Sequence, residues 1–338
     1  MTLRERFLQA MRGEGQLWIG DPWSCFCCPT FCRPMLPDAI SEMIGRCPPG
    51  GEAFLDAWGV AWDFPAGQPA PIPHITEDCK ALKDITNWRE EVRFPPLDGI
   101  DWSGAKEQWK AAACDEKLTM AVSGRGLFEF SHMMMGMEEA MVNYLLEPES
   151  MYGLLDRYTD WKIEAAKKII NELDPDFLMN HDDWGSKRQL FLPPGVWREI
   201  IKPLYKRYYD YVKSRGVFIM HHCDCYAEDL AVDMVDIGID VWQGATPEND
   251  INAVIEKTQG KLLVIGGIDM SVIEHPGASA SDIRAHIRQV IDAYAKNGHF
   301  LPCFSSISPI NETVAQISAD EMDGYGAIFT RKNKTRRR

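Results

Sequence analysis

A histidine and a cysteine stand two residues apart in the segment VFIMHHCDC, residues 217–225, and these side chains could hold a metal ion. Side chains two residues apart in an extended strand point to the same face, so we expect His221 and Cys223 on one face and His222 on the other. A third candidate ligand, Cys303, stands in the late segment FLPCF. Zn²⁺ prefers imidazole and thiolate ligands, and three protein ligands leave its fourth position open for a substrate atom.

The charge balance of this predicted zinc site indicates its chemistry. Two thiolates cancel the 2+ charge of zinc, because a neutral histidine adds no charge. Such a site can bind a thiol or a phenol in its anionic form, which makes that group a nucleophile or a leaving group. The pattern therefore predicts a catalytic metal rather than a structural one.

Carboxylates and aromatic side chains stand at similar strand ends. Asp182 and Asp183 precede Trp184, and either carboxylate could hold a substrate hydroxyl, act as a general acid, or cap the following loop. Trp242 and Gln243 end another predicted strand. We expect Trp184, Trp242 and Gln243 to bind the substrate.

Other histidines and cysteines nearby receive lesser roles. His181 and His222 are interpreted as structural or supporting residues rather than ligands. Cys225 has the parity of Cys223 but is expected beyond the strand end, so it is a reserve ligand. Four cysteines lie within eight residues at a spacing that matches no standard ligand pattern, and are interpreted as a thiol-rich loop over the active-site mouth: Cys25, Cys27, Cys28 and Cys32.

The elements that must position these residues alternate between strand and helix from residue 105 onward. Expected strands lie at residues 117–122, 177–180, 217–223, 241–243, 262–265 and 300–303. Expected helices lie at residues 137–147, 149–172, 194–215, 226–237, 250–259 and 281–297. This rhythm predicts an α/β fold with a parallel sheet, and its repetition favours a closed (β/α)8 TIM barrel. In such a barrel the chemistry lies at the C-terminal ends of the strands.

The first 100 or so residues are expected to decorate this barrel. They contain a predicted helix at residues 3–13, the cysteine-rich loop, and a small hairpin within residues 55–98. We therefore predict a single catalytic domain over residues 1–330, with an N-terminal elaboration. The basic run at residues 331–338 is predicted to be a disordered tail.

Composition narrows the class of protein. The 338 residues carry a formal net charge of −14, which argues against a nucleic-acid partner. Hydrophobic residues make up 45% and charged residues 25%, as in ordinary globular proteins. No stretch reaches the roughly 18 consecutive apolar residues of a membrane span, and the N-terminus is charged and amphipathic. We expect a cytoplasmic protein with no membrane partner.

Motifs along most of the chain resemble the uroporphyrinogen decarboxylase-like superfamily, and within it the zinc methyltransferases that work with corrinoid proteins. The matching segments are DAWGVAWDF at 56–64, GLFEF and MMMGME within 126–138, NHDDWGS at 180–186, KPLYKRYYDYVKSRG at 202–216, HHCD at 221–224, GIDVWQ at 238–243 and VIGGID at 264–269. The resemblance implies a TIM barrel with zinc held by a His-x-Cys pair on one strand and a distant cysteine on the last. The matching residues are His221, Cys223 and Cys303.

The resemblance also has departures and further implications. The family usually has glycine after the first cysteine, where this chain has Asp224, and its last cysteine usually lies in a glycine-rich context, whereas here it lies in LPCFSS. The shared DDWG motif selects Asp183 as the catalytic carboxylate. Decarboxylases of the superfamily hold a tetrapyrrole with an N-terminal arginine motif, whereas this chain has GDPWSCFCC there.

These implications together suggest methyl transfer between a small substrate and the cobalt of a separate corrinoid protein, because the D-x-H-x-x-G pattern of cobalamin-binding modules is absent from the sequence. In the preferred version, Zn²⁺ polarises the oxygen of a methoxylated, aromatic compound while Co(I) attacks its methyl group, as in an O-demethylase system. In the alternative, zinc activates a thiol of the coenzyme M type, which takes the methyl group from methylcobalamin. A uroporphyrinogen-type decarboxylase and a non-catalytic zinc barrel are the remaining alternatives.

Overall fold

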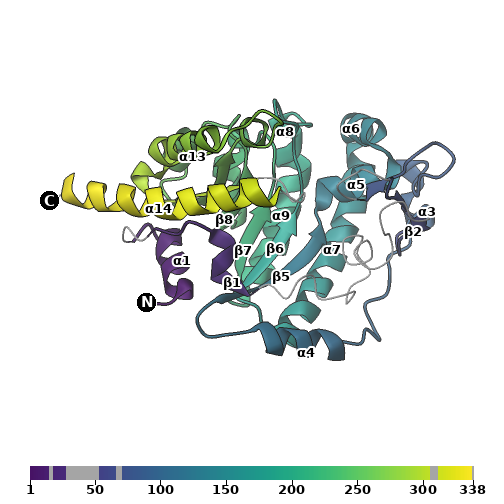
Figure 1. The fold of residues 1–338 in the computed structure, drawn as a ribbon. Helices are drawn as coiled ribbons and strands as arrows, with labels where there is room; N and C mark the ends of the chain where they lie inside the picture. Colours follow the sequence, from purple (N-terminus) through teal and green to yellow (C-terminus); the bar gives the residue numbers. More distant parts are fainter. Residues whose placement is uncertain (15–17, 28–52, 66–70, 305–310, 337–338) are drawn as a thin grey trace.

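The central element is a parallel sheet of seven strands in the order β1-β5-β6-β7-β8-β9-β10. The computed structural model describes residues 1–14, 18–27, 53–65, 71–304 and 311–336 (Figure 1). The strands of this sheet are β1 (Phe26–Cys27), β5 (Leu118–Arg125), β6 (Phe177–His181), β7 (Phe218–His222), β8 (Val241–Ala245), β9 (Leu263–Ile268) and β10 (Phe300–Phe304).

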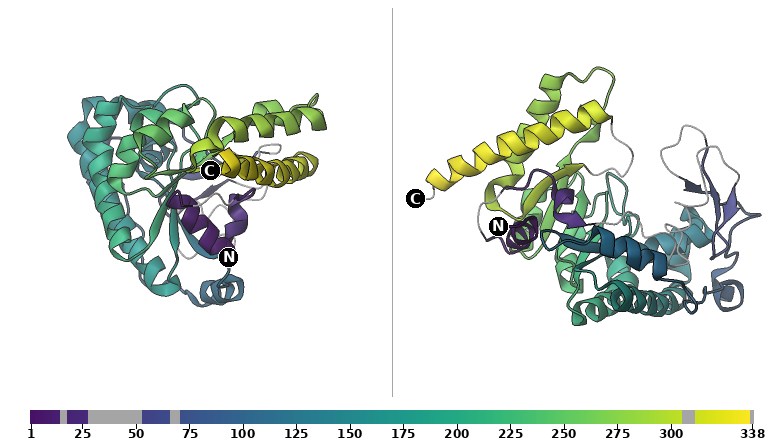
Figure 2. Two further views of the ribbon diagram at one scale, coloured as in Figure 1. Left: turned by 90° about the vertical axis from the view of Figure 1, so that its left-hand side faces the viewer. Right: turned by 60° about the horizontal axis from the view of Figure 1, so that its bottom comes forward.

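Helices separate the consecutive strands, as parallel pairing requires. They are α4 (Ser103–Ala112), α5 (Leu127–Met135), α6 (Met137–Leu146), α7 (Pro148–Leu173), α8 (Pro194–Val196), α9 (Lys202–Ser214), α10 (Ala231–Ile237), α11 (Ile251–Lys257), α12 (Met270–Ile273) and α13 (Ala280–Tyr294). The sheet curls into a half-barrel with these helices between its strands (Figures 1 and 2). The predicted (β/α)8 class is confirmed. Within the described residues, no ladder joins β10 to β1.

Both faces of the sheet are buried, in separate hydrophobic cores. On the inner face the strand side chains contact one another: Leu118, Met120, Phe177, Met220, Val241, Leu263, Ile265 and Leu301. On the outer face the alternate residues pack with the helices: Ala121, Leu178, Ile219, Trp242, Val264 and Phe300. Residues paired across parallel strands lie on the same face, so the ladder register assigns strand residues to one core or the other, except where it shifts after Val122 and after Gln243.

An N-terminal helix, α1 (Leu3–Met11), closes the amino-terminal end of the inner core. The ring of Phe7 lies edge-on to Phe26 and Phe177, with centroids 4.8 and 5.8 Å away. Arg4 fixes the helix by two hydrogen bonds of 2.5 and 2.6 Å to the carboxylate of Asp176, just before β6. The helix predicted at residues 3–13 is confirmed over residues 3–11.

The N-terminal elaboration contains a small antiparallel sheet of β2 (Phe54–Leu55), β3 (Ala61–Asp63) and β4 (Ile72–Pro73), followed by the short helix α3 (Trp88–Glu91). Trp58 anchors it to α7 through edge contacts with Tyr158 and Trp161, at 5.4 and 4.9 Å between centroids. A buried ion pair of 3.2 Å joins Asp56 to Arg125. Of the four clustered cysteines, Cys28 and Cys32 lie outside the described residues.

The C-terminal helix α14 (Glu312–Arg336) lies beside α13 (Figure 1). Glu321 of α14 binds Arg284 and Arg288 of α13 at 2.9 and 2.6 Å. The sequence predicted a disordered tail from residue 331, whereas the backbone is helical through Arg336. No helix in the described part of the chain is long and apolar enough to cross a membrane.

Candidate active site at the strand ends

The carboxyl ends of β6 and β7 place two histidines side by side on the inner face. His181 pairs with His222 in one ladder and His222 with Gln243 in the next, so the three residues form one row. The two imidazole rings are nearly parallel, with centroids 4.5 Å apart and 23° between their planes. The row lies two residues beyond Met220 and Val241, where the apolar interior ends.

A polar side chain holds each histidine through its Nδ1 atom. Nδ1 of His181 lies 2.8 Å from Oε1 of Glu129 on α5, and Nδ1 of His222 is hydrogen-bonded to Oε1 of Gln243 on β8. Both partner atoms are acceptor oxygens, so each Nδ1 is assigned as the proton donor. The Nε2 atom of each ring is then the atom that can bind a metal ion or accept a proton.

Asp183 completes this cluster from the loop after β6. Its Oδ1 atom accepts a hydrogen bond of 3.0 Å from the backbone amide of Asp224. One ligand atom from each of His181, Asp183 and His222 lies within 4.8 Å of the other two. His222 is buried, whereas His181 and Asp183 are half-buried, so the cluster faces the solvent side of the strand ends.

The charges of the cluster shift pKa values strongly. Burial lowers the pKa of His181, but the charge and hydrogen bond of Glu129 outweigh this effect and raise the pKa to about 10. Burial raises the pKa of Asp224 to about 7, and the negative charge of Asp183 adds to this effect. The site therefore combines a readily protonated imidazole with a carboxyl group that titrates near neutrality.

The neighbouring carboxylate, Asp182, points to the outer face and is completely buried. It accepts four hydrogen bonds, from the backbone amides of Phe128 and Glu129, the indole of Trp184 and the hydroxyl of Tyr205. Burial raises its pKa to about 6. Asp182 thus caps the start of α5, and strand alternation leaves Asp183 as the carboxylate at the rim.

The predicted ligand His221 lies on the outer face, not the inner one. Its Nδ1 atom is 2.8 Å from the hydroxyl of Tyr209, and its Nε2 atom is 3.3 Å from the backbone oxygen of Asp182. The indole of Trp184 packs on the imidazole, with centroids 4.3 Å apart. Strand alternation correctly placed His221 and His222 on opposite faces. The structure shows that His222, and not the predicted ligand His221, points inward.

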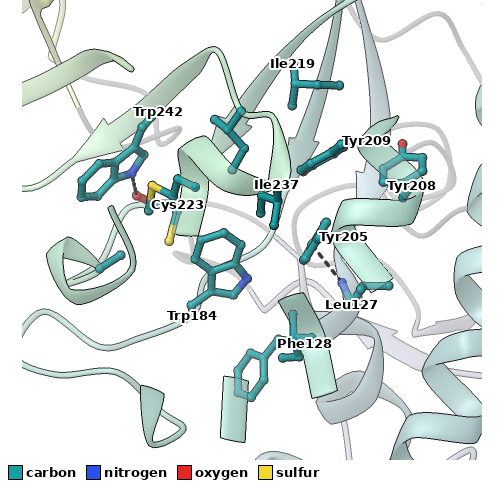
Figure 3. Close-up of a cluster of buried hydrophobic side chains, with 14 of the residues drawn as sticks. Leu127, Phe128, Trp184, Tyr205, Tyr208, Tyr209, Ile219, Cys223, Ile237 and Trp242 are labelled. Carbon is teal, nitrogen blue, oxygen red and sulfur yellow. Dashed lines mark hydrogen bonds between the residues drawn. The ribbon is translucent and has the colours of Figure 1, made fainter. Parts of the chain in front are cut away.

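The two predicted cysteine ligands lie in different cores. Cys223 is buried with the outer-face side chains (Figure 3), and its Sγ atom is 3.1 Å from that of Cys225. Cys303 belongs to the inner core, where burial raises its pKa to about 12 and Trp23 lies against it. Across the described residues, His221, Cys223 and Cys303 do not form a cluster of ligand atoms. The ligand set expected from the sequence is therefore not assembled.

The three predicted substrate-binding residues also divide between the faces. Trp184 and Trp242 are only 2% and 0% exposed and pack in the outer core, where the Trp242 indole donates to the backbone oxygen of Cys223 at 2.9 Å (Figure 3). Gln243 faces inward and holds His222. We therefore assign the tryptophans to packing and Gln243 to the site.

Sequence reasoning missed Glu129 and treated His181 and His222 as supporting residues only. Glu129 lies between the strand expected at residues 117–122 and the helix expected at residues 137–147, in a segment that the structure shows as α5. The signal for the two histidines was their place at the ends of consecutive strands, but only the ladder register shows that they are paired. Register depends on contacts between distant segments, which a single sequence does not display.

Comparisons with known proteins agree with this fold. The sequence matches none of the curated proteins with which it was compared. Among solved structures, a methyltransferase from Methanosarcina mazei superposes with a TM-score of 0.59 at 14% sequence identity, covering 96% of this chain and 99% of that one. At this identity the likeness shows a shared fold alone. The sequence profile of the uroporphyrinogen decarboxylase (URO-D) family matches residues 54–308, which is more than half of the chain. The chain therefore belongs to the uroporphyrinogen decarboxylase family.

Proposed function

We propose that the protein is a methyltransferase, and that it moves a methyl group from a methoxylated aromatic substrate to the Co(I) corrinoid of a separate protein. Within the family, the main support for this function is the acidic character of the rim, which is the cluster of side chains at the carboxyl ends of the strands. The inward cluster contains Glu129, Asp183 and Asp224 around two histidines. The M. mazei neighbour supports the class of reaction, since its fold serves a methyltransferase.

An acidic rim disfavours the decarboxylation of a polycarboxylate. A tetrapyrrole with several carboxylates needs cationic partners, and like charges would repel it from this rim. Arg125, on β5 beside His181, is committed to a buried ion pair with Asp56. A neutral ether meets no such repulsion, so methyl transfer suits the charges better than decarboxylation.

The proposed reaction balances without an outside oxidant. The electron pair of Co(I) forms the cobalt–carbon bond, the methyl–oxygen bond breaks, and its electron pair stays on the phenol oxygen, which takes up a proton. Zn²⁺ is the cofactor proposed with this reaction, and it would polarise the ether oxygen. Asp183 is the carboxylate proposed to act at this oxygen, because it is half-buried within the cluster, and the proton of the phenol comes from water.

The thiol version remains the second candidate. There the acceptor would be a thiol of the coenzyme M type and the donor methylcobalamin. The ether is preferred because it is neutral, whereas the acidic rim would repel a thiolate; the apolar side chains of α5, such as Phe128 and Met134, are buried in the core. In either version the corrinoid protein would dock over the strand ends, since its cobalt must reach the substrate there.

The test measures the conversion of Co(I) to methyl-Co(III) by absorption spectroscopy. Purified, zinc-supplemented protein is mixed with a Co(I) corrinoid protein and a series of methoxyarenes, and separately with methylcobalamin and thiols. We expect methyl-Co(III) to form with a methoxyarene, and Asp183→Asn to slow this about 10²–10⁴-fold. Failure with both substrate classes would reject methyl transfer, and release of CO₂ from a porphyrinogen would support the decarboxylase.

A further inference from the structure

We propose that the catalytic metal ion is held by His181, Asp183 and His222, and not by the His-x-Cys pair and late cysteine that the sequence suggested. This inference rests on the proposed function only in expecting a metal cofactor. It assigns three nitrogen and oxygen ligands at the inner rim, with a fourth position open to the substrate. Zinc sites with two histidines and one carboxylate are of the catalytic kind.

The first support is that ligand atoms converge before any metal is bound. One atom from each of the three side chains lies within 4.8 Å of the others, so shifts of about 1 Å would give Zn–N and Zn–O distances of about 2.0–2.2 Å. The half-buried position of His181 and Asp183 lets a substrate oxygen reach the ion.

The second support is the pair of acceptors behind the histidines. Histidines that bind a metal through one nitrogen usually donate the other N–H to a carboxylate or carbonyl oxygen, which fixes the ring and its tautomer. Glu129 stands 2.8 Å behind His181, and the amide oxygen of Gln243 stands behind His222. An acceptor oxygen thus lies at Nδ1 of each ring, which leaves Nε2 as the nitrogen that would bind the shared metal ion.

The charge of this site differs from that of a thiolate site. Metal binding would displace the extra proton of His181, and two neutral imidazoles and one carboxylate then leave a bound divalent ion with a net charge of about 1+, which Glu129 and Asp224 compensate from outside. Nitrogen and oxygen ligands also keep the ion harder than thiolates would. The site would therefore select an oxygen leaving group over a thiol, which favours the ether substrate.

A competing cluster shares one of these ligands. Asp183, Cys223 and Cys225 also bring ligand atoms within 4.8 Å of one another. However, both cysteines are buried, and Cys223 lies among the outer-face tryptophans (Figure 3). A metal ion there would be closed off from substrate and would need two buried thiols to lose their protons. Asp183 cannot bind a metal ion in both clusters at once, so we assign the metal ion to the cluster of His181, Asp183 and His222.

The deciding experiment is X-ray absorption spectroscopy of the zinc-loaded protein. We expect one equivalent of zinc with a nitrogen and oxygen shell at about 2.0–2.1 Å and no sulfur shell at about 2.3 Å. The Co²⁺-substituted protein should lack the near-ultraviolet band of a cobalt thiolate. A sulfur shell, or absence of bound zinc, would overturn the proposal whether or not methyl transfer is observed.

Variants identify the ligands independently of the spectrum. We expect His222→Gln and Asp183→Asn to weaken zinc binding by about 100-fold or more, and Gln243→Ala by about 10–100-fold through loss of ring orientation. Cys303→Ser and Cys225→Ser are the matched controls and should retain wild-type affinity. Thermal unfolding in the presence of a chelator checks that each variant folds. Zinc affinity that falls with the cysteine variants and survives His222→Gln would assign the metal to the sulfur ligands instead.

Discussion

Replacement of Asp182 tests whether this carboxylate is a structural cap while its neighbour Asp183 belongs to the site. Asp182 is 0% exposed and receives four donors. Its Oδ1 atom accepts from the amide of Glu129 at 2.8 Å, and its Oδ2 atom accepts the other three hydrogen bonds. In Asp182→Asn, the remaining oxygen can still accept the three hydrogen bonds made by Oδ2. The new NH₂ group then faces the Glu129 amide, which loses its acceptor.

The expected losses are graded by the number of donors left without an acceptor. One buried unsatisfied donor costs about 1–3 kcal/mol, which is the predicted loss for Asp182→Asn. Asp182→Ala leaves all four unsatisfied, so we expect about 3–5 kcal/mol or more, as when a buried charged group loses its partners. This is a large share of the free energy of unfolding of a typical protein, about 5–15 kcal/mol. By contrast, Asp183→Asn should change stability by about 1 kcal/mol or less, because its oxygen can still accept from Asp224.

The assay is denaturant unfolding followed by circular dichroism, with a chelator present so that metal binding does not contribute. The adjacent variants Asp182→Asn and Asp183→Asn are matched in chemistry and lie on opposite faces. Zinc binding is then measured on the same samples. Equal losses of stability, or a larger loss for Asp183→Asn, would refute the assignment of faces on which the site depends.

Three further predictions concern neighbouring contacts. Gly126→Ala should destabilise the protein by about 1–3 kcal/mol or more, since the added Cβ would lie 2.1 Å from Cβ of Asp182 and 2.3 Å from the hydroxyl of Tyr205. Thermal unfolding at the wild-type temperature would contradict this close approach. Tyr209→Phe should cost about 0.5–1.5 kcal/mol and leave zinc affinity unchanged, because the hydroxyl that it removes contacts the outer-face His221 at 2.8 Å and not the three proposed ligands; a large fall in affinity would restore His221 as a ligand. Arg4→Met tests the pKa of Asp176, which burial raises but which the hydrogen bonds of Arg4 and Thr119 lower on balance. A carboxyl group whose pKa is lower in the folded protein stabilises the fold at pH values above its unfolded pKa of about 3.9. Arg4→Met should therefore be less stable than wild type near pH 7, and the difference in unfolding free energy should fade as the pH falls below about 4. A constant difference across that range would contradict the linkage.

The fold was predictable from sequence because its signal is local. Alternating helices and strands with short connections indicate a parallel α/β fold, and the strands predicted from residue 117 onward all appear in the sheet. The errors fall where local pattern is weak. α5 starts with LFEF, which reads equally well as an apolar strand or loop, and its cap is supplied by Asp182, more than 50 residues away. The helical end of α14 carries a basic sequence that resembles a solvated tail.

The site was predictable only in part, because strand parity has no absolute sign. In a sheet that borders water on one side, polar residues mark the exposed face. Here both faces are buried, as is usual for a parallel sheet, so alternation separates His221 from His222 without showing which one faces inward. The same limit explains why Trp184 and Trp242 looked like pocket residues. Cys303 was correctly placed on the last strand but lies with the opposite face from Cys223.

The inward position of His222 therefore depends on the register of β7, and apolar contacts below the site specify that register. Phe218 packs against Phe177 with centroids 5.1 Å apart, and Met220 fills the inner core beside Val241. A slip by one residue would move every side chain of β7 to the opposite face. It would bring His221 inward, but it would also remove Met220 from the inner core and break the pairing of His181 with His222. The packing of the barrel interior, several residues from the chemistry, thus decides which of two adjacent histidines can bind a metal.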